Sequence, residues 1–301
     1  IQVRRSRAPD IHIHTLGRPR MILAVASGKG GTGKTTVATN LAWTAARNAG
    51  RVMYLDCDVE EPNGHIFLKP AIERKYVVET LVPEVDEGKC TACGECREIC
   101  QYSAIALLGK TVLTFPNLCH SCGGCSLVCP TGAITEVGRE IGTIEEGVAD
   151  GVRFVHGLLN VGEAMSPPLI RQVKKKLPEE GLAIIDAPPG TSCPVIEAVK
   201  GADYVVLVTE PTPFGLNDLV LAVEMLRVLK LPFGVAVNRA DVGDDAVFDY
   251  CRSRAIDVIV RIPNDRRIAE TYSRGQLAAQ ALPEYAEVFS SLLEVVAGVR
   301  L

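Results

Sequence analysis

The chain of 301 residues carries a formal net charge of −4, and 47% of its residues are hydrophobic and 23% are charged. This composition is that of an ordinary globular protein, and it excludes a disordered chain, a coiled coil and a collagen-like fibre. The slight acidity and an aromatic content of only 5% argue against general nucleic-acid binding. At about 150 residues per domain, the length suggests one large domain or two smaller ones.

The N-terminal arm, residues 1–20, is rich in arginine. We expect a solvated arm or an added edge strand, with a basic docking tail as the alternative. The arm lacks the apolar stretch of a secretory signal, and no run of eighteen uncharged apolar residues occurs in the chain. We therefore expect a cytoplasmic protein without stable membrane insertion. Eleven cysteines without a secretory signal favour metal sites over disulfides.

The first predicted elements are a buried strand over 21–26, a glycine-rich loop, a helix over 37–48 and a second buried strand over 52–56. This order is typical of the start of a parallel α/β sheet. Late in the chain, strands are predicted over 182–186, 204–209, 233–237 and 258–262, and helices over 216–229, 244–253 and 283–296. Because the strands are apolar on both faces, we predict a mostly parallel, doubly wound sheet covered by helices.

Between these halves, from about Glu84 to Glu136, long apolar runs vanish and cysteine and glycine recur. Such a segment cannot build an apolar core of its own and needs metals or cross-links. We therefore predict an inserted small domain over 85–135, within one α/β domain formed by 21–84 and 136–301. Short strand-like patterns resume over 141–161.

A phosphate-binding loop is predicted at Gly28–Thr35, which fits the pattern G-x-x-x-x-G-K-[ST] between a strand and a helix. Glycines let backbone N–H groups approach phosphate oxygens, and the helix N-terminus adds a positive dipole. Lys34 is expected to reach the β- and γ-phosphates, and the Thr35 hydroxyl to bind Mg²⁺. The expected nucleotide-binding residues here are Gly28, Lys29, Gly30, Gly31, Thr32, Gly33, Lys34, Thr35 and Thr36.

Lys29 is a second lysine at the start of this loop. With it, the run KGGTGKTT resembles the deviant Walker A loop of the MinD/ParA/Mrp/nitrogenase-iron-protein class of P-loop ATPases. In that class the first lysine reaches across a dimer interface to the partner's nucleotide. The resemblance implies ATP and Mg²⁺ as ligands, an ATP-dependent homodimer, and a role in trans for Lys29. A solvated loop lysine is the alternative.

Carboxylates follow two of the predicted strands, and such positions lie beside the phosphate site of open α/β sheets. The resemblance implies that Asp58 orients the attacking water, while Asp56 assists Mg²⁺ through water or caps the strand end. Asp186 precedes Ala-Pro-Pro-Gly, so it matches the Walker B aspartate, which holds Mg²⁺ through water. Gly190 is the expected pivot of a switch that reorders with the γ-phosphate.

The adenine site is predicted from the resemblance alone. In the family an asparagine at the position of Asn238, beside Arg239, reads the edge of the base. The stretch containing Pro263 resembles the loop that closes over the base. An ordinary turn residue at a strand end is the alternative for Asn238.

Eight of the eleven cysteines form two copies of C-x2-C-x2-C-x3-C, beginning at Cys90 and Cys119. This spacing resembles that of two-cluster bacterial ferredoxins, in which the fourth cysteine of each run ligates the other cluster. Zinc is the alternative ligand of such soft thiolates. The resemblance implies two [4Fe–4S] clusters, the first held by Cys90, Cys93, Cys96 and Cys129, and the second by Cys119, Cys122, Cys125 and Cys100.

Three cysteines lie outside these runs. We expect Cys57 and Cys251 to be packed in the core. Cys193 has two interpretations: a buried or capping residue, or a thiol that faces its own copy in a dimer. The second rests on the nitrogenase iron protein, which places a cluster ligand at the same distance after its switch aspartate.

As a whole, the sequence resembles MinD-superfamily ATPases that contain an inserted ferredoxin domain. The first hypothesis is an ATP-gated electron carrier that acts on an unknown partner redox or metal-cofactor protein, because all eight paired thiols are used as cluster ligands. The alternative is an iron–sulfur cluster carrier or assembly ATPase of the Mrp type. A MinD-like positioning ATPase comes third, because the last predicted helix is acidic rather than basic.

Overall fold

The structure is a computed structural model that describes residues 20–48 and 50–297. Except for Arg20, the predicted basic arm lies outside the described residues. Within them, no helix is both long enough and apolar enough to cross a bilayer.

The main element is one sheet, which has nine strands in the described residues, in the order β11-β10-β9-β1-β8-β2-β7-β6-β3. The strands from β11 to β7 run parallel, and β6 and β3 join the β7 edge antiparallel. Their bounds are β1 Arg20–Ser27, β2 Val52–Asp56, β3 Ala71–Val85, β6 Ile134–Ala149, β7 Val152–Leu159, β8 Gly181–Pro189, β9 Tyr204–Thr209, β10 Phe233–Val237 and β11 Val258–Arg261. The predicted mostly parallel sheet is confirmed.

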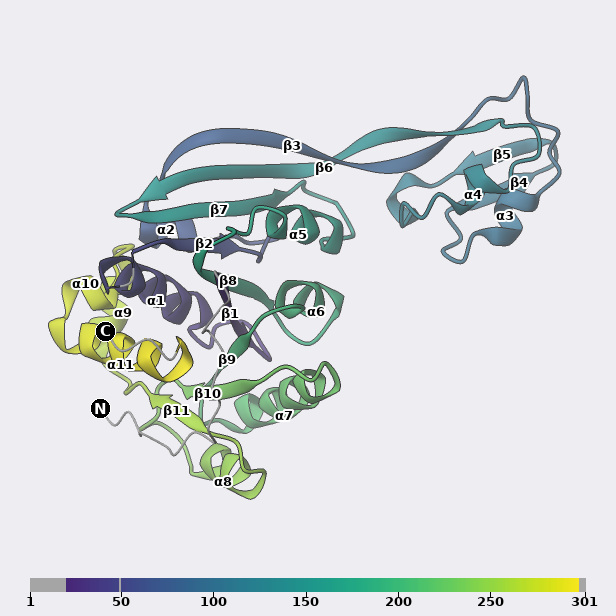
Figure 1. Cartoon of the computed structure of the whole chain (residues 1–301). Coiled ribbons are helices and arrows are strands. Elements are labelled where there is room, and N and C mark those ends of the chain that lie inside the picture. The colour runs from purple at the N-terminus through teal and green to yellow at the C-terminus, as the bar shows by residue number, and fades with distance from the viewer. Residues whose placement is uncertain (1–19, 49, 298–301) are drawn as a thin grey trace.

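Helices cover both faces of the sheet (Figure 1). One layer contains α1 Lys34–Asn48, α2 Gly64–Leu68, α9 Arg266–Ser273, α10 Ala278–Ala281 and α11 Pro283–Ala297. The other contains α5 Pro167–Lys174, α6 Cys193–Val199, α7 Pro213–Val228 and α8 Ala246–Ser253. The helices predicted over 37–48, 216–229, 244–253 and 283–296 are confirmed to within a few residues.

The strand β1 shows why the apolar runs form this sheet. Leu23 and Val25 pack into the apolar cluster under α1 and α11, whereas Ala24 and Ala26 pack into the cluster under α5 to α8. A strand that is buried on both faces needs apolar residues at every position, not at alternate ones. The sheet therefore separates two apolar cores and ends in loops that carry the polar motifs.

The antiparallel edge extends far beyond the sheet (Figure 1). β6 pairs with β7 only from Gly142 onward, and its earlier residues pair with β3 alone. We call the unsupported part, residues 79–85 and 134–141, the ribbon. The short strands predicted over 141–161 were wrong in length at the β6 end, and β3 was not predicted, because much of this edge is exposed and lacks a buried apolar run.

Residues 86–133, which we call the cysteine module, lie at the far end of the ribbon (Figure 1). The module contains α3 Glu95–Ile99, the hairpin of β4 Ile105–Leu108 and β5 Thr111–Thr114, the 3₁₀ turn η1 Pro116–Leu118, and α4 Gly124–Leu127. The strands β3 and β6 end and begin within two residues of the predicted limits of the insert. The division of the chain into domains stays a prediction.

Candidate functional site

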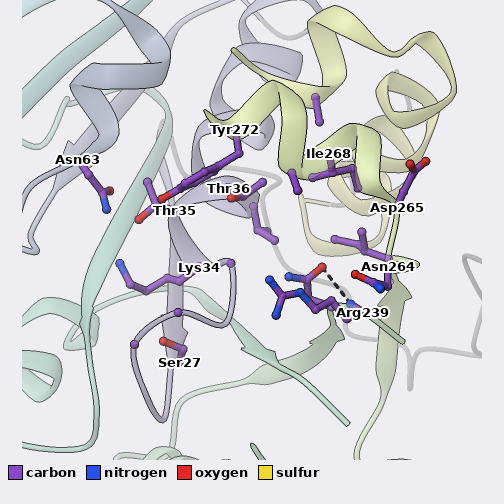
Figure 2. A pocket seen from close by; sticks show the side chains of 18 of the residues that line it. Ser27, Lys34, Thr35, Thr36, Asn63, Arg239, Asn264, Asp265, Ile268 and Tyr272 are labelled. Atoms are coloured by element: carbon purple, nitrogen blue, oxygen red, sulfur yellow. Dashed lines mark hydrogen bonds between the residues drawn. The ribbon is translucent and has the colours of Figure 1, made fainter. Parts of the chain in front are cut away.

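A cavity of about 460 Å³ opens beside the glycine loop between β1 and α1. Many of the residues predicted to bind nucleotide line it, namely Gly30, Gly31, Gly33, Lys34, Thr35, Thr36, Asp58, Asn238, Arg239 and Pro263. Figure 2 shows Lys34 on one side of this pocket and Arg239 and Asn264 on the other. The pocket thus has two polar ends. We call the end that holds Lys34 the phosphate end, because the sequence predicts phosphate binding there.

Lys34 is the buried cation of the phosphate end. Its Nζ lies 2.5 Å from Asp186 Oδ1 and 3.6 Å from Asp58 Oδ2. Burial alone would lower the pKa of Lys34, but these two carboxylates outweigh it and raise the pKa. The lysine is therefore charged, and the two carboxylates are its partners in this structure.

The carboxylates around Lys34 differ in their surroundings. Burial raises the pKa of Asp58 to about 6 although Lys34 opposes the shift, and this residue lines the cavity. Asp186 is fully buried and also accepts a hydrogen bond from the Tyr54 hydroxyl at 2.9 Å. Asp56 accepts hydrogen bonds from the backbone N–H groups of Asp58 and Gly64, which is the capping role that the sequence left open.

At the other end of the pocket, the Asn238 side chain is bound to the glycine loop. Its Nδ2 donates to the carbonyl of Thr32 at 2.9 Å, and its Oδ1 accepts from the Arg239 N–H at 3.0 Å. A Cβ at Gly33 would meet Asn238 Nδ2 at 2.5 Å, so only glycine permits this approach. Pro263 lines the same cavity. The two residues that we expected beside the base thus line one cavity with the glycine loop, and the base-binding role stays a prediction.

Four predicted residues do not line the cavity, namely Gly28, Lys29, Thr32 and Asp186. Asp186 lies behind Lys34, and Gly28 is required because a Cβ there would meet the Asp218 carbonyl oxygen at 2.3 Å. Lys29 is half-buried, and its carbonyl accepts a hydrogen bond from Ser27 Oγ. The action of Lys29 in trans stays a prediction.

Sequence reasoning missed the contribution of α9 to the pocket. Ile268 and Tyr272 of this helix line the cavity, as do Glu61 and Asn63 from the loop after β2. The start of α9 carries a readable signal: the Asp265 side chain accepts a hydrogen bond from the Arg267 N–H and caps the helix. An aspartate before a helical pattern could therefore have located the start of this helix, although not its contact with the pocket.

The eight paired cysteines fall into two groups in the module. Cys90, Cys93, Cys96 and Cys129 line one small cavity, and Cys100, Cys119, Cys122 and Cys125 line another. These are the two sets that the crossed assignment predicts. In the described part of the chain, no three side chains meet closely enough to hold a single metal ion. A four-iron cluster needs a wider set, because each thiolate binds a different iron atom.

The two cysteine runs repeat in backbone conformation as well as in sequence. Positive φ angles recur 29 residues apart, at Ala92 and Ser121, at Gly94 and Gly123, and at Ser103 and Gly132. Each repeat then starts a short helix, α3 or α4, directly after its glycine. The non-glycine positions among these are strained, and strained positions persist only where the surrounding structure fixes them, so the two repeats share a defined backbone conformation.

Backbone amides donate to the cysteine sulfurs. The N–H groups of Ala104 and Ala133 point at Cys100 Sγ and Cys129 Sγ, at 3.3 and 3.2 Å. Burial alone would raise the pKa of Cys129, but hydrogen bonds from Ala133 and Thr131 lower it. Amide donors stabilise the thiolate form, which is the form that binds metal. The donor set thus fits iron–sulfur clusters in its chemistry.

The remaining cysteines separate clearly. Cys57 and Cys251 are buried as predicted, and burial raises the pKa of both. Cys193 is exposed at the first residue of α6, so of the interpretation as a buried or capping residue the buried form was wrong, whereas its place at the start of a helix leaves the capping form open. The interpretation of a thiol that faces its own copy stays untested.

Comparison with known proteins now assigns the larger part of the chain. Residues 23–278 match the family described as the CobQ/CobB/MinD/ParA nucleotide-binding domain. The chain belongs to this family. The MinD/ParA-type chain also has the fold of a solved member: the septum site-determining protein MinD of Pyrococcus horikoshii, in complex with Mg-ADP, has a TM-score of 0.55 at 21% identity and covers 92% of this chain and 95% of its own.

The longer matches to this MinD/ParA-type chain are with two uncharacterized proteins of Methanocaldococcus jannaschii. One is 32% identical over 85% of this chain and 90% of its own length, and the other is 38% identical over 73% and 78%. A shorter match is to the iron–sulfur cluster carrier protein of Pseudomonas fragi, at 52% identity over 16% of this chain and 17% of that protein. An iron–sulfur cluster carrier protein is thus among the proteins that match part of this chain.

Proposed function

We propose that this protein binds and hydrolyses Mg-ATP beside the glycine loop, holds two [4Fe–4S] clusters in the cysteine module, and acts in the transfer or assembly of iron–sulfur clusters. The observation that carries the proposal is the division of eight cysteines between two cavities, four in each, on a MinD/ParA-type chain. The proposal includes the predicted insert over 85–135 and an ATPase domain formed by 21–84 and 136–301.

In the ATP half of the proposal, Lys34 leaves Asp186 to contact the β- and γ-phosphates. Thr35 and, through water, Asp186 hold Mg²⁺, which neutralises charge that develops on the phosphates. Asp58 orients the attacking water from the wall of the cavity. Lys29 serves the partner's nucleotide in an ATP-dependent homodimer, and its position outside its own pocket supports that role.

The cluster half has two candidate tasks. Sequence reasoning ranks electron transfer first, because each cluster would have four cysteine ligands and no open position. Similarity to an iron–sulfur cluster carrier protein favours transfer or assembly instead, and we place that task first. Electron transfer toward a partner metalloprotein is the second candidate, supported by the four thiols that line each cavity.

A transfer assay separates the two tasks. The full chain, reconstituted under anoxic conditions, is mixed with an apo-ferredoxin as acceptor, with and without ATP. Cluster transfer predicts that cluster absorbance moves to the acceptor at a rate that ATP changes, and that Lys34→Met abolishes the ATP effect. Clusters that stay on the donor, with a reduction potential that shifts with ATP, would overturn transfer in favour of electron transfer.

The crossed ligand sets have their own test. Cys100→Ser is expected to alter the spectrum of the cluster held by Cys119, Cys122 and Cys125, although it lies in the other run. Cys193→Ser is the matched control, because Cys193 is exposed and lies outside the module. Loss of the first cluster in Cys100→Ser would contradict the crossed assignment.

A further inference from the structure

A continuous set of contacts joins the phosphate end of the pocket to the part of β6 where the ribbon leaves the sheet. We call this part, residues 139–141, the root of the ribbon. The first member of this set is the segment after β2, residues 58–60. In this segment, Asp58 Oδ2 lies 3.6 Å from Lys34 Nζ. A phosphate that binds Lys34 competes directly with this carboxylate. Nucleotide binding must therefore change the surroundings of the segment, which gives a differential interaction between two states.

The segment is fastened to the end of β7 and to the loop that follows. The Leu159 N–H donates to the Val59 carbonyl at 2.8 Å, and Ser166 Oγ donates to Glu60 Oε1 at 2.9 Å. Ser166 is only 3% exposed, whereas Glu60 is exposed, so the buried end of this hydrogen bond lies on the loop. Contact with β7 is also tight, because a Cβ at Gly157 would lie 2.7 Å from a Val59 methyl carbon.

The loop 160–166 is in turn fastened to β6 where the ribbon leaves the sheet. The Asn160 N–H donates to the Ile141 carbonyl at 2.9 Å. Arg139 Nη1 lies 2.7 Å from Glu163 Oε2, whose side chain is only 4% exposed. A buried carboxylate with a charged partner is costly to separate, so the loop and the ribbon root move together.

The geometry of the ribbon amplifies motion at its root. Eight residues of β6, 134–141, have only β3 as a neighbour in the sheet, and at about 3.3 Å per residue they span roughly 26 Å. A small rotation at Arg139 therefore displaces the cysteine module at the far end (Figure 1).

We propose that the loop 160–166 transmits the nucleotide state of the glycine-loop site to the ribbon and its cysteine module, with Glu163, Ser166 and Arg139 as positioning residues. This regulation rests on the proposed function, because it requires nucleotide in the pocket. It names the part of the chain through which ATP controls the position of the module. None of these three residues lines the nucleotide pocket or either cysteine cavity.

Hydrogen–deuterium exchange of the full chain tests the proposal without requiring loaded clusters. Peptides that cover 134–141 are followed with and without a non-hydrolysable ATP analogue. We expect the analogue to change exchange there by about fivefold or more, the low end of ordinary coupling between sites. Arg139→Gln should abolish this change while the affinity for the analogue stays as in the wild type. Arg139→Lys, which keeps the charge, should restore part of it.

Lys176→Gln is the matched control, because Lys176 makes an ion pair of the same length, 2.7 Å, with Glu146 farther along β6 and outside the loop. It should keep the full response. An analogue that binds without changing exchange at 134–141, or a response that survives in Arg139→Gln, would overturn the transmission and leave the proposed function standing. No binding of the analogue would overturn both.

Discussion

The sheet and the cysteine module are held together by different means. Two large clusters of buried apolar side chains cover the two faces of the sheet. The module contributes Cys96, Ile105 and Cys125 to one small cluster of four buried residues, which Ile134 of the ribbon completes, and the two cysteines are predicted cluster ligands. A segment with so small a core depends on what its cysteines bind, whereas the sheet can fold on its apolar pattern alone.

Removal of the proposed clusters should give the largest effect that this comparison predicts. After iron is stripped by a chelator under anoxic conditions, amides of residues 86–133 should exchange almost as in an unfolded chain. Amides of β1, β8 and β9 should keep their protection, because apolar burial holds them. Mass spectrometry of exchanged peptides from both regions measures this directly. A stripped protein whose module stays as protected as its sheet would refute the comparison.

Replacement of Lys34 should give the next largest effect, now within the sheet. Lys34→Met leaves Asp186 buried without its cationic partner, and the loss of one member of a buried pair costs about 3–5 kcal/mol. Denaturant unfolding of the nucleotide-free protein measures this cost, and nucleotide affinity should be lost as well.

Lys29→Met is the control for that substitution, because Lys29 is only half-buried. Its stability should stay within about 0.5 kcal/mol of the wild type, as for most surface substitutions. Equal stability of Lys34→Met and Lys29→Met would show that the buried pair contributes little.

The comparison also explains which parts of the fold the sequence could predict. Runs such as 204–209 predict a strand correctly, because burial on both faces leaves an unbroken apolar pattern. β3 left no such pattern, since many of its side chains lie on an exposed edge and ribbon. Its position depends on pairing with β6, from Val85 opposite Ile134 to Ala71 opposite Val148, and no local pattern encodes a pairing over such a distance in the chain.

The candidate site likewise has residues that the sequence could predict and residues that it could not. Lys34, Asp58 and Asn238 follow strands that end at one edge of the sheet, so motif and topology together placed them beside one pocket. Tyr272 could not be placed, because it reaches the pocket from α9 through tertiary packing alone. The contact between Arg139 and Glu163 could not be predicted from the sequence either, because it depends on how β6 and the loop after β7 pack together.

A smaller effect is expected at the tightest point between β7 and the segment after β2. Gly157→Ala would place its new carbon 2.7 Å from Val59 Cγ1 and 2.9 Å from Val173 Cγ2. Overpacking of this kind costs about 1–3 kcal/mol. Gly30→Ala is the control, because nothing lies within 4 Å of its new carbon. Thermal unfolding of both variants without nucleotide should show a loss for Gly157→Ala only, and equal midpoints would mean that the neighbouring side chains yield freely.

The smallest expected effect is a pH dependence that comes from Asp58. Burial raises the pKa of this carboxyl from 3.8 to about 6, so between these values the folded protein keeps a proton that the unfolded chain has lost. The contribution of Asp58 to stability is therefore present at low pH and is lost as pH rises from about 4 to 6. Asp58→Asn cannot ionise, so its stability relative to the wild type should increase over that window and then level off. Unfolding midpoints of both proteins at pH 4, 5, 6 and 7.5 give this difference, from which other titrating groups cancel. A difference that shrinks with rising pH would show that Lys34 lowers the pKa of Asp58 by more than burial raises it. If Asp58→Asn is more stable than the wild type and hydrolyses ATP more slowly, Asp58 serves the reaction and lowers the stability of the sheet. The module differs in that it should gain stability from the groups that it binds.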